Sequence, residues 1–270
     1  VLPKAENEEY HRIESIFQTI DVCDELCVKL SEKKNVCSVR CDTLVLPQSN
    51  TITKAYERFC ELSGIDAGFE VVLKKNIPSG GGLGGGSSDA ASFIKAIAEI
   101  LDFSLTDAFA DCVADKVGSD VFFFLSLDGK SEGAAIVSGR GEVVKPIVPR
   151  KDLHYVLVFP GVHSSTAEAY ADIDKNAGRS SDVRLPIDSL ERVYRSSVEE
   201  WTFANDFTPG IANKYLKVRQ ALRDVESSGA LFSDMSGSGS TVFGVFESAE
   251  RAQAAMDLLA GSWNAFYCEK

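Results

Sequence analysis

Hydrophobic and polar positions in the first half of the chain follow two periods, one typical of strands and one typical of helices. Alternation or short apolar runs predict strands over residues 25–30, 36–46, 69–73, 134–138 and 143–147, the last two joined by a turn at Gly139-Arg140-Gly141. Helical spacing predicts helices over residues 50–62, 90–100 and 109–117. Residues 10–21 carry a further apolar set, which we assign to the core: Ile13, Ile16, Phe17 and Ile20.

The second half shows the same mixture of strands and helices. Apolar runs predict strands over residues 155–159, 241–246 and 265–268, and helical spacing predicts helices over 164–170, 189–197, 211–228 and 249–260. The polar stretch 175–182 predicts a mobile loop. The polar segment 149–152 is the best candidate for a boundary, so we expect an α+β protein with domains at 1–149 and 150–270.

A glycine-rich loop joins the strand at 69–73 to the helix that follows. Six of the 21 glycines lie within residues 80–86, directly before Ser87-Ser88-Asp89. Glycines let backbone N–H groups turn toward a ligand, and a helix start favours negative charge. The stretch satisfies G-x-G-x-x-G, but a dinucleotide site expects the glycines at the strand end and an acid about 20 residues on. The nearest such acid, Asp102, closes the helix, and no Walker lysine follows the glycines. The loop predicts phosphate binding.

Two further polar turns are candidates for chemistry. Gly118-Ser119-Asp120 stands before the apolar run 121–125, where Asp120 is either a helix-cap or turn residue or a catalytic carboxylate. A second glycine and serine loop, residues 234–240, precedes the strand predicted at 241–246.

Composition excludes several classes of function. A net charge of −12 argues against nucleic acid as a partner, and no apolar run approaches the length of a membrane span. Seven cysteines without a C-x-x-C pair argue against zinc and predict reduced thiols in a cytoplasmic or plastid stromal compartment. The first residues show no apolar signal region and no initiator Met, so we expect further residues ahead of Val1.

Four motifs in order resemble the GHMP kinases, the superfamily of galactokinase, homoserine, mevalonate and phosphomevalonate kinases. Pro78 to Ala91 is similar to the superfamily's phosphate loop, P-x-x-x-G-L-G-S-S-A-A. The extra glycine before the serines is typical of the branch that phosphorylates a cytidine diphosphate derivative of methylerythritol in the non-mevalonate isoprenoid pathway. That branch also has Y-H-x-x-x-S/T-x-F-Q, G-A-D-V-P-F-F and M-S-G-S-G, which resemble residues 10–18, 118–124 and 235–239.

The resemblance implies a two-domain fold, with an N-terminal domain like domain 2 of ribosomal protein S5 and a ferredoxin-like C-terminal domain. It also implies a site between the domains, ATP with Mg²⁺, and a small-molecule acceptor. Asp120 would be the catalytic carboxylate, and Ser87 or Ser88 would lie near the metal. The residues implied to hold ATP are Pro78, Gly80, Gly81, Gly82, Leu83, Gly84, Gly85, Gly86, Ser87 and Ser88. Those implied to hold the acceptor are Tyr10 and Tyr170 around the cytosine ring, His11 at its edge, Thr166, Gly237 and Gly239.

Two departures from the family pattern bear on activity. Phe122 stands where the family usually has Pro. The family opens with P-A-K-x-N-L-x-L, and the resemblance implies that this Lys pairs with the catalytic carboxylate. Here Val1-Leu2 corresponds to the end of that strand, and Lys4 lies beyond it. The alternatives are another GHMP kinase, of mevalonate or homoserine type, or a nucleotide-binding homologue with impaired catalysis.

Overall fold

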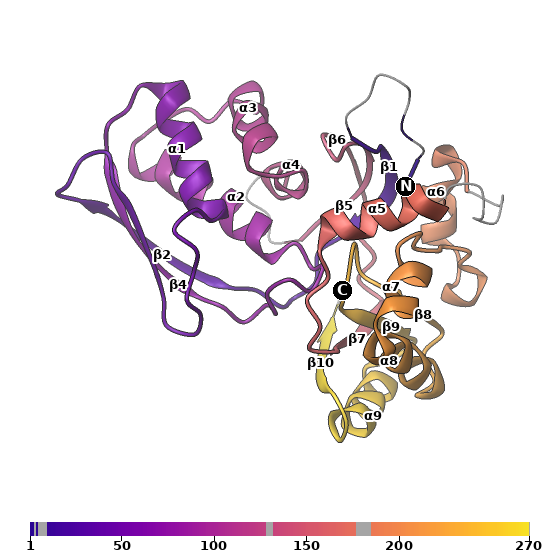
Figure 1. Ribbon diagram of the computed structural model, residues 1–270. Coiled ribbons are helices and arrows are strands. Elements are labelled where there is room, and N and C mark those ends of the chain that lie inside the picture. The colour runs from indigo at the N-terminus through magenta and orange to yellow at the C-terminus, as the bar shows by residue number, and fades with distance from the viewer. Residues whose placement is uncertain (3, 5–9, 128–131, 177–184, 270) are drawn as a thin grey trace.

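A computed structural model describes residues 1, 2, 4, 10–127, 132–176 and 185–269 of the chain. Within these residues the strands form three separate sheets, ordered β1-β5-β6, β2-β4-β3 and β10-β7-β9-β8. In Figure 1 the β2-β4-β3 sheet and helices α1 to α4 form one lobe, and the other two sheets lie together in a second body. Within the described residues no helix is long and apolar enough to cross a membrane.

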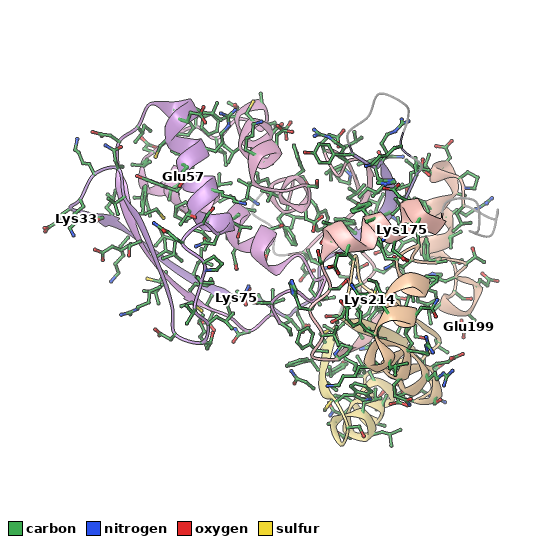
Figure 2. All side chains as sticks on the ribbon, in the orientation of Figure 1. Lys33, Glu57, Lys75, Lys175, Glu199 and Lys214 are labelled. Atoms are coloured by element: carbon green, nitrogen blue, oxygen red, sulfur yellow. The ribbon has the colours of Figure 1, made fainter. Side chains whose placement is uncertain are left out.

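The first lobe packs two of its four helices on a three-stranded sheet, and the other two helices pack against that pair. Its strands are β2 (Glu25–Ser31), β3 (Cys37–Cys41) and β4 (Gly68–Lys74), with β4 in the middle, antiparallel to β2 and parallel to β3. Its helices are α1 (Thr51–Ser63), α2 (Gly85–Ile100), α3 (Asp107–Val117) and α4 (Asp120–Leu125). Because side chains alternate along a strand, β4 turns Phe69, Val71 and Leu73 into the core against α2. Lys33 and Lys75 mark opposite ends of this sheet (Figure 2).

The second sheet contains β1 (Ile13–Gln18), β5 (Ala134–Gly139) and β6 (Val143–Ile147), all antiparallel. The predicted hairpin between β5 and β6 is therefore confirmed. Of the apolar set in residues 10–21, Ile13, Ile16 and Phe17 lie in strand β1, and Ile20 lies beyond its end. Only one side of β1 is paired within the described residues. Helix α6 (Ile187–Arg195) contacts both β1 and β5, so this sheet also packs against the second half of the chain.

The third sheet has the ferredoxin-like arrangement that the family resemblance implies. Its strands are β7 (His154–Phe159), β8 (Phe232–Met235), β9 (Val242–Phe246) and β10 (Asn264–Glu269). Helices lie between β7 and β8 and between β9 and β10, and every neighbouring pair is antiparallel. The helices are α5 (Thr166–Asn176), α6, the short 3₁₀ helix Val198–Glu200, α7 (Thr208–Lys214), α8 (Leu216–Ser227) and α9 (Ala249–Ala260).

The structure differs from the sequence predictions in several details, and α4 and the part of α5 beyond residue 170 were not predicted. The helix predicted over 211–228 is two helices, because Tyr215 is extended (φ −119°, ψ 103°) and separates α7 from α8. The strand predicted over 36–46 covers only Cys37–Cys41, and strand β8 was not predicted. The loop predicted at 175–182 falls largely outside the described residues, and the division of domains after residue 149 stays a prediction.

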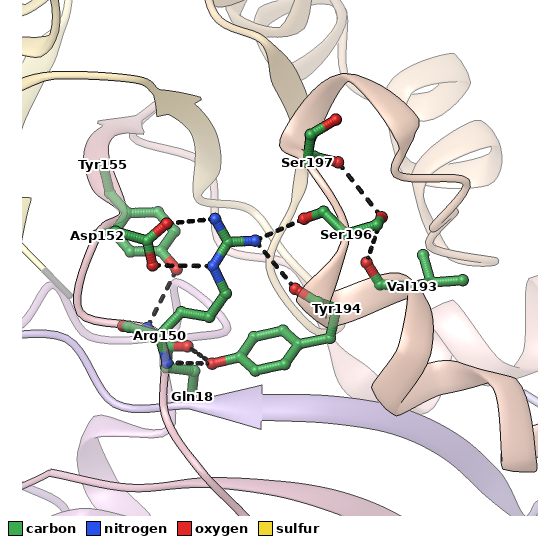
Figure 3. Close-up of polar contacts among 8 residues, drawn as sticks. All are labelled: Gln18, Arg150, Asp152, Tyr155, Val193, Tyr194, Ser196 and Ser197. Atoms are coloured by element: carbon green, nitrogen blue, oxygen red, sulfur yellow. Dashed lines mark hydrogen bonds and ion pairs between the residues drawn. The ribbon is translucent and has the colours of Figure 1, made fainter.

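A polar network around Arg150 joins β1 to α6 (Figure 3). The Arg150 guanidinium donates to the carbonyl oxygens of Tyr194 (3.1 Å) and Ser196 (2.7 Å) and to the Asp152 carboxylate (2.9 Å). The Arg150 backbone N–H donates to the Tyr194 hydroxyl (2.7 Å), and the Gln18 amide donates to the Arg150 carbonyl oxygen (3.1 Å). Arg150, in the segment predicted as a boundary, therefore ties an early strand to a late helix: its backbone carbonyl oxygen bonds to β1, and its side chain bonds to the end of α6.

Candidate active site

The predicted phosphate loop, residues 78–88, is a loop over residues 78–84 and continues as the first turn of α2. Gly80, Gly82 and Gly84 have φ values of +70°, +75° and +68°, a region that side chains rarely adopt. The backbone N–H groups of Ser87 and Ser88 donate to the Gly84 carbonyl oxygen (3.0 and 2.9 Å), which closes the first helical turn. The loop thus ends at the N-terminus of a 16-residue helix, where N–H groups and the helix dipole favour an anion.

The second glycine loop packs directly on the first. The Ser236 hydroxyl donates to the Gly82 carbonyl oxygen (2.9 Å), and the Thr241 N–H donates to the Gly81 carbonyl oxygen (3.0 Å). A Cβ on Gly82 would lie 2.2 Å from the Ser236 carbonyl oxygen and 3.0 Å from the Gly239 nitrogen. The contact between the loops therefore requires glycine at position 82.

Asn205 supports the second loop and was missed by the sequence analysis. Its side-chain amide donates to the carbonyl oxygens of Met235 (2.6 Å) and Gly237 (2.7 Å). Gly237 and Gly239, which the resemblance singled out, both have positive φ values. Nothing in the local sequence around Asn205 marks it, because its partners are about 30 residues away.

Asp120 lies at the start of α4 and faces the phosphate loop. One of its carboxylate oxygens is 3.9 Å from the position that a Cβ on Gly84 would take. Burial raises the pKa of Asp120 above the usual range. The turn between β5 and β6 packs closely against Ser119, the residue before Asp120, since a Cβ on Gly141 would lie 2.7 Å from the Ser119 Cβ. Asp120 is thus both the first residue of a helix and a carboxylate held in the site.

Asp120, both loops and helix α5 line one cavity of about 580 Å³, a size that suits a small ligand. The cavity runs between strand β1 on one side and strand β8 on the other. Of the predicted site residues it is lined by Gly82, Leu83, Gly84, Asp120, Thr166, Tyr170 and Gly237. Aromatic side chains form much of the remaining wall: Phe17, Phe123, Phe124, Tyr155, Tyr194, Trp201, Phe203, Phe207, Phe232 and Phe243.

The aromatic residues proposed for base binding lie in different surroundings. Tyr170 lines the cavity, and the His11 ring stacks on it with a centroid distance of 5.1 Å and an interplanar angle of 19°. His11 is buried, with Nδ1 2.9 Å from the Leu2 carbonyl oxygen and Nε2 2.9 Å from the Asp174 carboxylate. Tyr10 is 55% exposed, and its ring faces the Arg140 guanidinium at 5.7 Å. The structure therefore brings His11, rather than Tyr10, against Tyr170.

Residues that could hold Mg²⁺ are hydroxyl and carboxylate donors beside the loop. Within the described residues no group of three or more His, Cys, Asp or Glu side chains could hold a metal ion. The Ser87 hydroxyl lies 4.0 Å from the position of a Cβ on Gly118, so it faces the segment that carries Asp120. The Ser88 hydroxyl instead donates to the Gly85 carbonyl oxygen (2.8 Å). Hard oxygen donors of this kind suit Mg²⁺, which usually completes its shell with water and substrate phosphates.

Lys4 does not approach Asp120. Its ammonium group lies 4.0 Å from the Asp174 carboxylate on α5, the same carboxylate that His11 contacts. This position agrees with the sequence analysis, in which Lys4 could not take the place of the family's lysine.

The fold and the site define a class of small-molecule kinase. The sequence matches the family models "GHMP kinases N terminal domain" over residues 50–126 and "GHMP kinases C terminal" over residues 188–262. The fold is similar to that of a homoserine kinase from Cytophaga hutchinsonii, with a TM-score of 0.67 at 18% identity, covering 99% of this chain and 97% of that one. These similarities place the two glycine loops and Asp120 within a GHMP kinase fold.

Relatives of higher sequence identity indicate which branch of the GHMP kinases this chain belongs to. The 4-diphosphocytidyl-2-C-methyl-D-erythritol kinase of Treponema pallidum (strain Nichols) is 37% identical over 260 residues, which are 94% of this chain and 88% of that protein. The enzyme of the same name from Thermodesulfovibrio yellowstonii is 34% identical over 264 residues, 96% of this chain and 90% of that protein. A crystal structure of 4-(cytidine 5'-diphospho)-2C-methyl-D-erythritol kinase matches with a TM-score of 0.80 at 25% identity, covering 98% of this chain and 92% of that one. The chain belongs to the 4-diphosphocytidyl-2-C-methyl-D-erythritol kinase family of the GHMP kinases.

Proposed function

We propose that this protein transfers the γ-phosphoryl group of ATP to the 2-hydroxyl of 4-diphosphocytidyl-2-C-methyl-D-erythritol. The observation that carries the proposal is the position of Asp120, which lines one cavity together with both glycine loops. Phosphoryl transfer needs positioning and charge stabilisation more than covalent chemistry. A loop for phosphates and one carboxylate for the acceptor hydroxyl supply these two needs.

The phosphates of ATP would lie along residues 80–88, with backbone N–H groups and the N-terminus of α2 facing them. Ser87 is the better candidate for contact with Mg²⁺, since its hydroxyl faces the Asp120 segment while that of Ser88 points back to Gly85. The bound ion would supply charge neutralisation on the transferred group. Asp120 would orient the acceptor hydroxyl or accept its proton, and its raised pKa makes it a stronger base than an exposed aspartate.

The acceptor would enter the same cavity from the side of α5. Tyr170 offers a ring for stacking on the cytosine, and His11 behind it holds that ring in place. Thr166 and Ser238 hydroxyls lie 2.8 Å apart at the opening, where they join α5 to the second glycine loop. Tyr10 stays a candidate for the other face of the base, although Arg140 faces its ring here.

The test is ADP release by the protein with three alcohols in turn: 4-diphosphocytidyl-2-C-methyl-D-erythritol, mevalonate and homoserine. We expect turnover with the cytidine compound alone, and loss of that turnover in Asp120→Asn. Turnover with mevalonate or homoserine instead would assign another GHMP activity. ATP binding without turnover on any of the three would favour a nucleotide-binding homologue.

A further inference from the structure

A buried ion cluster lies behind the phosphate loop and is not part of the cavity. The Lys75 ammonium contacts the carboxylates of Asp24 and Asp89, the latter at 2.9 Å. The three side chains are only 8%, 2% and 5% exposed. Figure 2 shows Lys75 at the end of the first lobe that faces the rest of the molecule.

The cluster joins three elements that meet at the loop. Lys75 directly follows β4, Asp24 directly precedes β2, and Asp89 lies in the second turn of α2. A single ammonium group therefore links two of the three strands of this sheet, β2 and β4, to the helix that follows the loop.

Asp24 also holds the backbone that enters the loop. One of its carboxylate oxygens accepts hydrogen bonds from the N–H groups of Asn76 (2.6 Å) and Ile77 (2.8 Å). The Asn76 side chain in turn donates to the Cys23 carbonyl oxygen (2.9 Å). The residues immediately before Pro78 are thus fixed by the same carboxylate that contacts Lys75.

The C-terminal end of the loop, at Gly85, contacts the Lys75 ammonium group. A Cβ on Gly85, the first residue of α2, would lie 3.2 Å from the Lys75 nitrogen and 3.0 Å from an Ile77 methyl carbon. The entrance of the loop is held through Asp24, and its exit is held through Asp89 and the contact under Gly85. The two ends of the loop of residues 78–84 are therefore both held by contacts to the Lys75 ammonium group.

We propose that Lys75 is a positioning residue, which holds the two ends of the phosphate loop at a fixed separation through Asp24 and Asp89 so that ATP meets a preorganised loop. The proposal rests on the proposed function, in which this loop binds the ATP phosphates. A buried ion pair seldom adds net stability, but loss of one partner leaves the others uncompensated and free to shift the backbone. Small displacements of a positioning group are costly for binding and catalysis.

The test compares Lys75→Met with Lys74→Met. Lys74 is the neighbouring residue, with a 62% exposed side chain that pairs with exposed Glu25, so it controls for loss of a lysine at this strand end. We expect Lys75→Met to raise the KM for ATP, and the Kd of a non-hydrolysable ATP analogue measured by calorimetry, about tenfold. The KM for the cytidine alcohol should change by less than about twofold, as should all constants of Lys74→Met.

A second pair of variants keeps the proposal testable if Lys75→Met does not fold. In Asp89→Asn the amide oxygen can still accept from Lys75, whereas Asp89→Leu has no acceptor. We expect Asp89→Asn to bind the analogue close to the original protein and Asp89→Leu to bind it as weakly as Lys75→Met. Combined with Lys75→Met, Asp89→Leu should add little, because both break the same link.

Equal behaviour of Asp89→Asn and Asp89→Leu, or parallel rises in both KM values, would overturn the proposal. So would unchanged nucleotide binding in Lys75→Met. Failure of the proposed function is distinguishable, because the original protein would then bind the ATP analogue but release no ADP with the cytidine alcohol. The calorimetric comparison of the variants still decides the role of Lys75 in that case.

Discussion

Replacement of Gly82 by alanine tests the contact between the two glycine loops. An added Cβ would lie 2.2 Å from the Ser236 carbonyl oxygen, so the loops must separate by about 0.8 Å to restore a contact of 3.0 Å. Overpacking of this kind costs about 1–3 kcal/mol, and the positive φ of +75° adds roughly 1–2 kcal/mol for a non-glycine residue. A displacement near 1 Å beside the reacting groups lowers the rate about 100-fold.

Gly64→Ala is the matched control. Gly64 ends helix α1 with φ +70°, and a Cβ there would meet nothing within 4 Å. The unfolding free energy of Gly64→Ala should therefore fall only by the backbone strain of roughly 1–2 kcal/mol, and its kcat/KM should stay unchanged. The assays are urea unfolding and kcat/KM for ATP. A Gly82→Ala enzyme with the kcat/KM and unfolding free energy of Gly64→Ala would refute the close contact between the loops.

Four further predictions concern the site and its support. Asp120→Asn should lower kcat by about 10²–10⁴-fold while the Kd of an ATP analogue stays unchanged; an effect on Kd alone would contradict the catalytic role. Because burial raises the pKa of Asp120 and the base must be ionised, kcat should fall as pH drops through that raised pKa, with a midpoint above the ordinary Asp value of about 3.9 in a pH–rate profile. Tyr170→Ala should weaken binding of the cytidine alcohol by about 1–3 kcal/mol in a calorimetric titration, and equal affinity would exclude Tyr170 from base stacking. Arg150→Met should lower the unfolding free energy by about 1–3 kcal/mol, because the partly buried carbonyl oxygens of Tyr194 and Ser196 lose their donor; no loss on chemical denaturation would mean that this network is dispensable.

Local patterns in the sequence predicted the unit of strand, glycine loop and helix. Glycine is the residue that adopts positive φ without strain, and the positions of Gly80, Gly82 and Gly84 bear this out. The apolar face of α2 and the alternation of β4 reflect burial on one side of each element, which repeats at a fixed spacing along the chain. The ferredoxin-like order of β7 to β10 was implied only by the family resemblance, and the structure confirms it.

Errors in the prediction came from places where local pattern and tertiary packing differ. The helical spacing of apolar residues continues across Tyr215, so the break between α7 and α8 is not visible in the sequence pattern. Strand β8 has four residues, paired only with β9 within the described chain, and its Ser233 and Asp234 look like loop residues. Whether a short polar stretch becomes a strand depends on the partner beside it, and that partner is decided by the fold.

The sequence by itself determined which segments can turn, which face of each helix is buried and which carboxylate stands before an apolar run. Only the tertiary structure decided what these groups meet. Ser236 reaches Gly82 across 154 positions, and Lys75 reaches Asp24 across 51. Backbone conformation and periodicity depend on neighbours in the chain, so they are visible in the sequence. Contacts between distant segments depend on how every intervening element packs, so they cannot be read from the residues at the two ends of the contact.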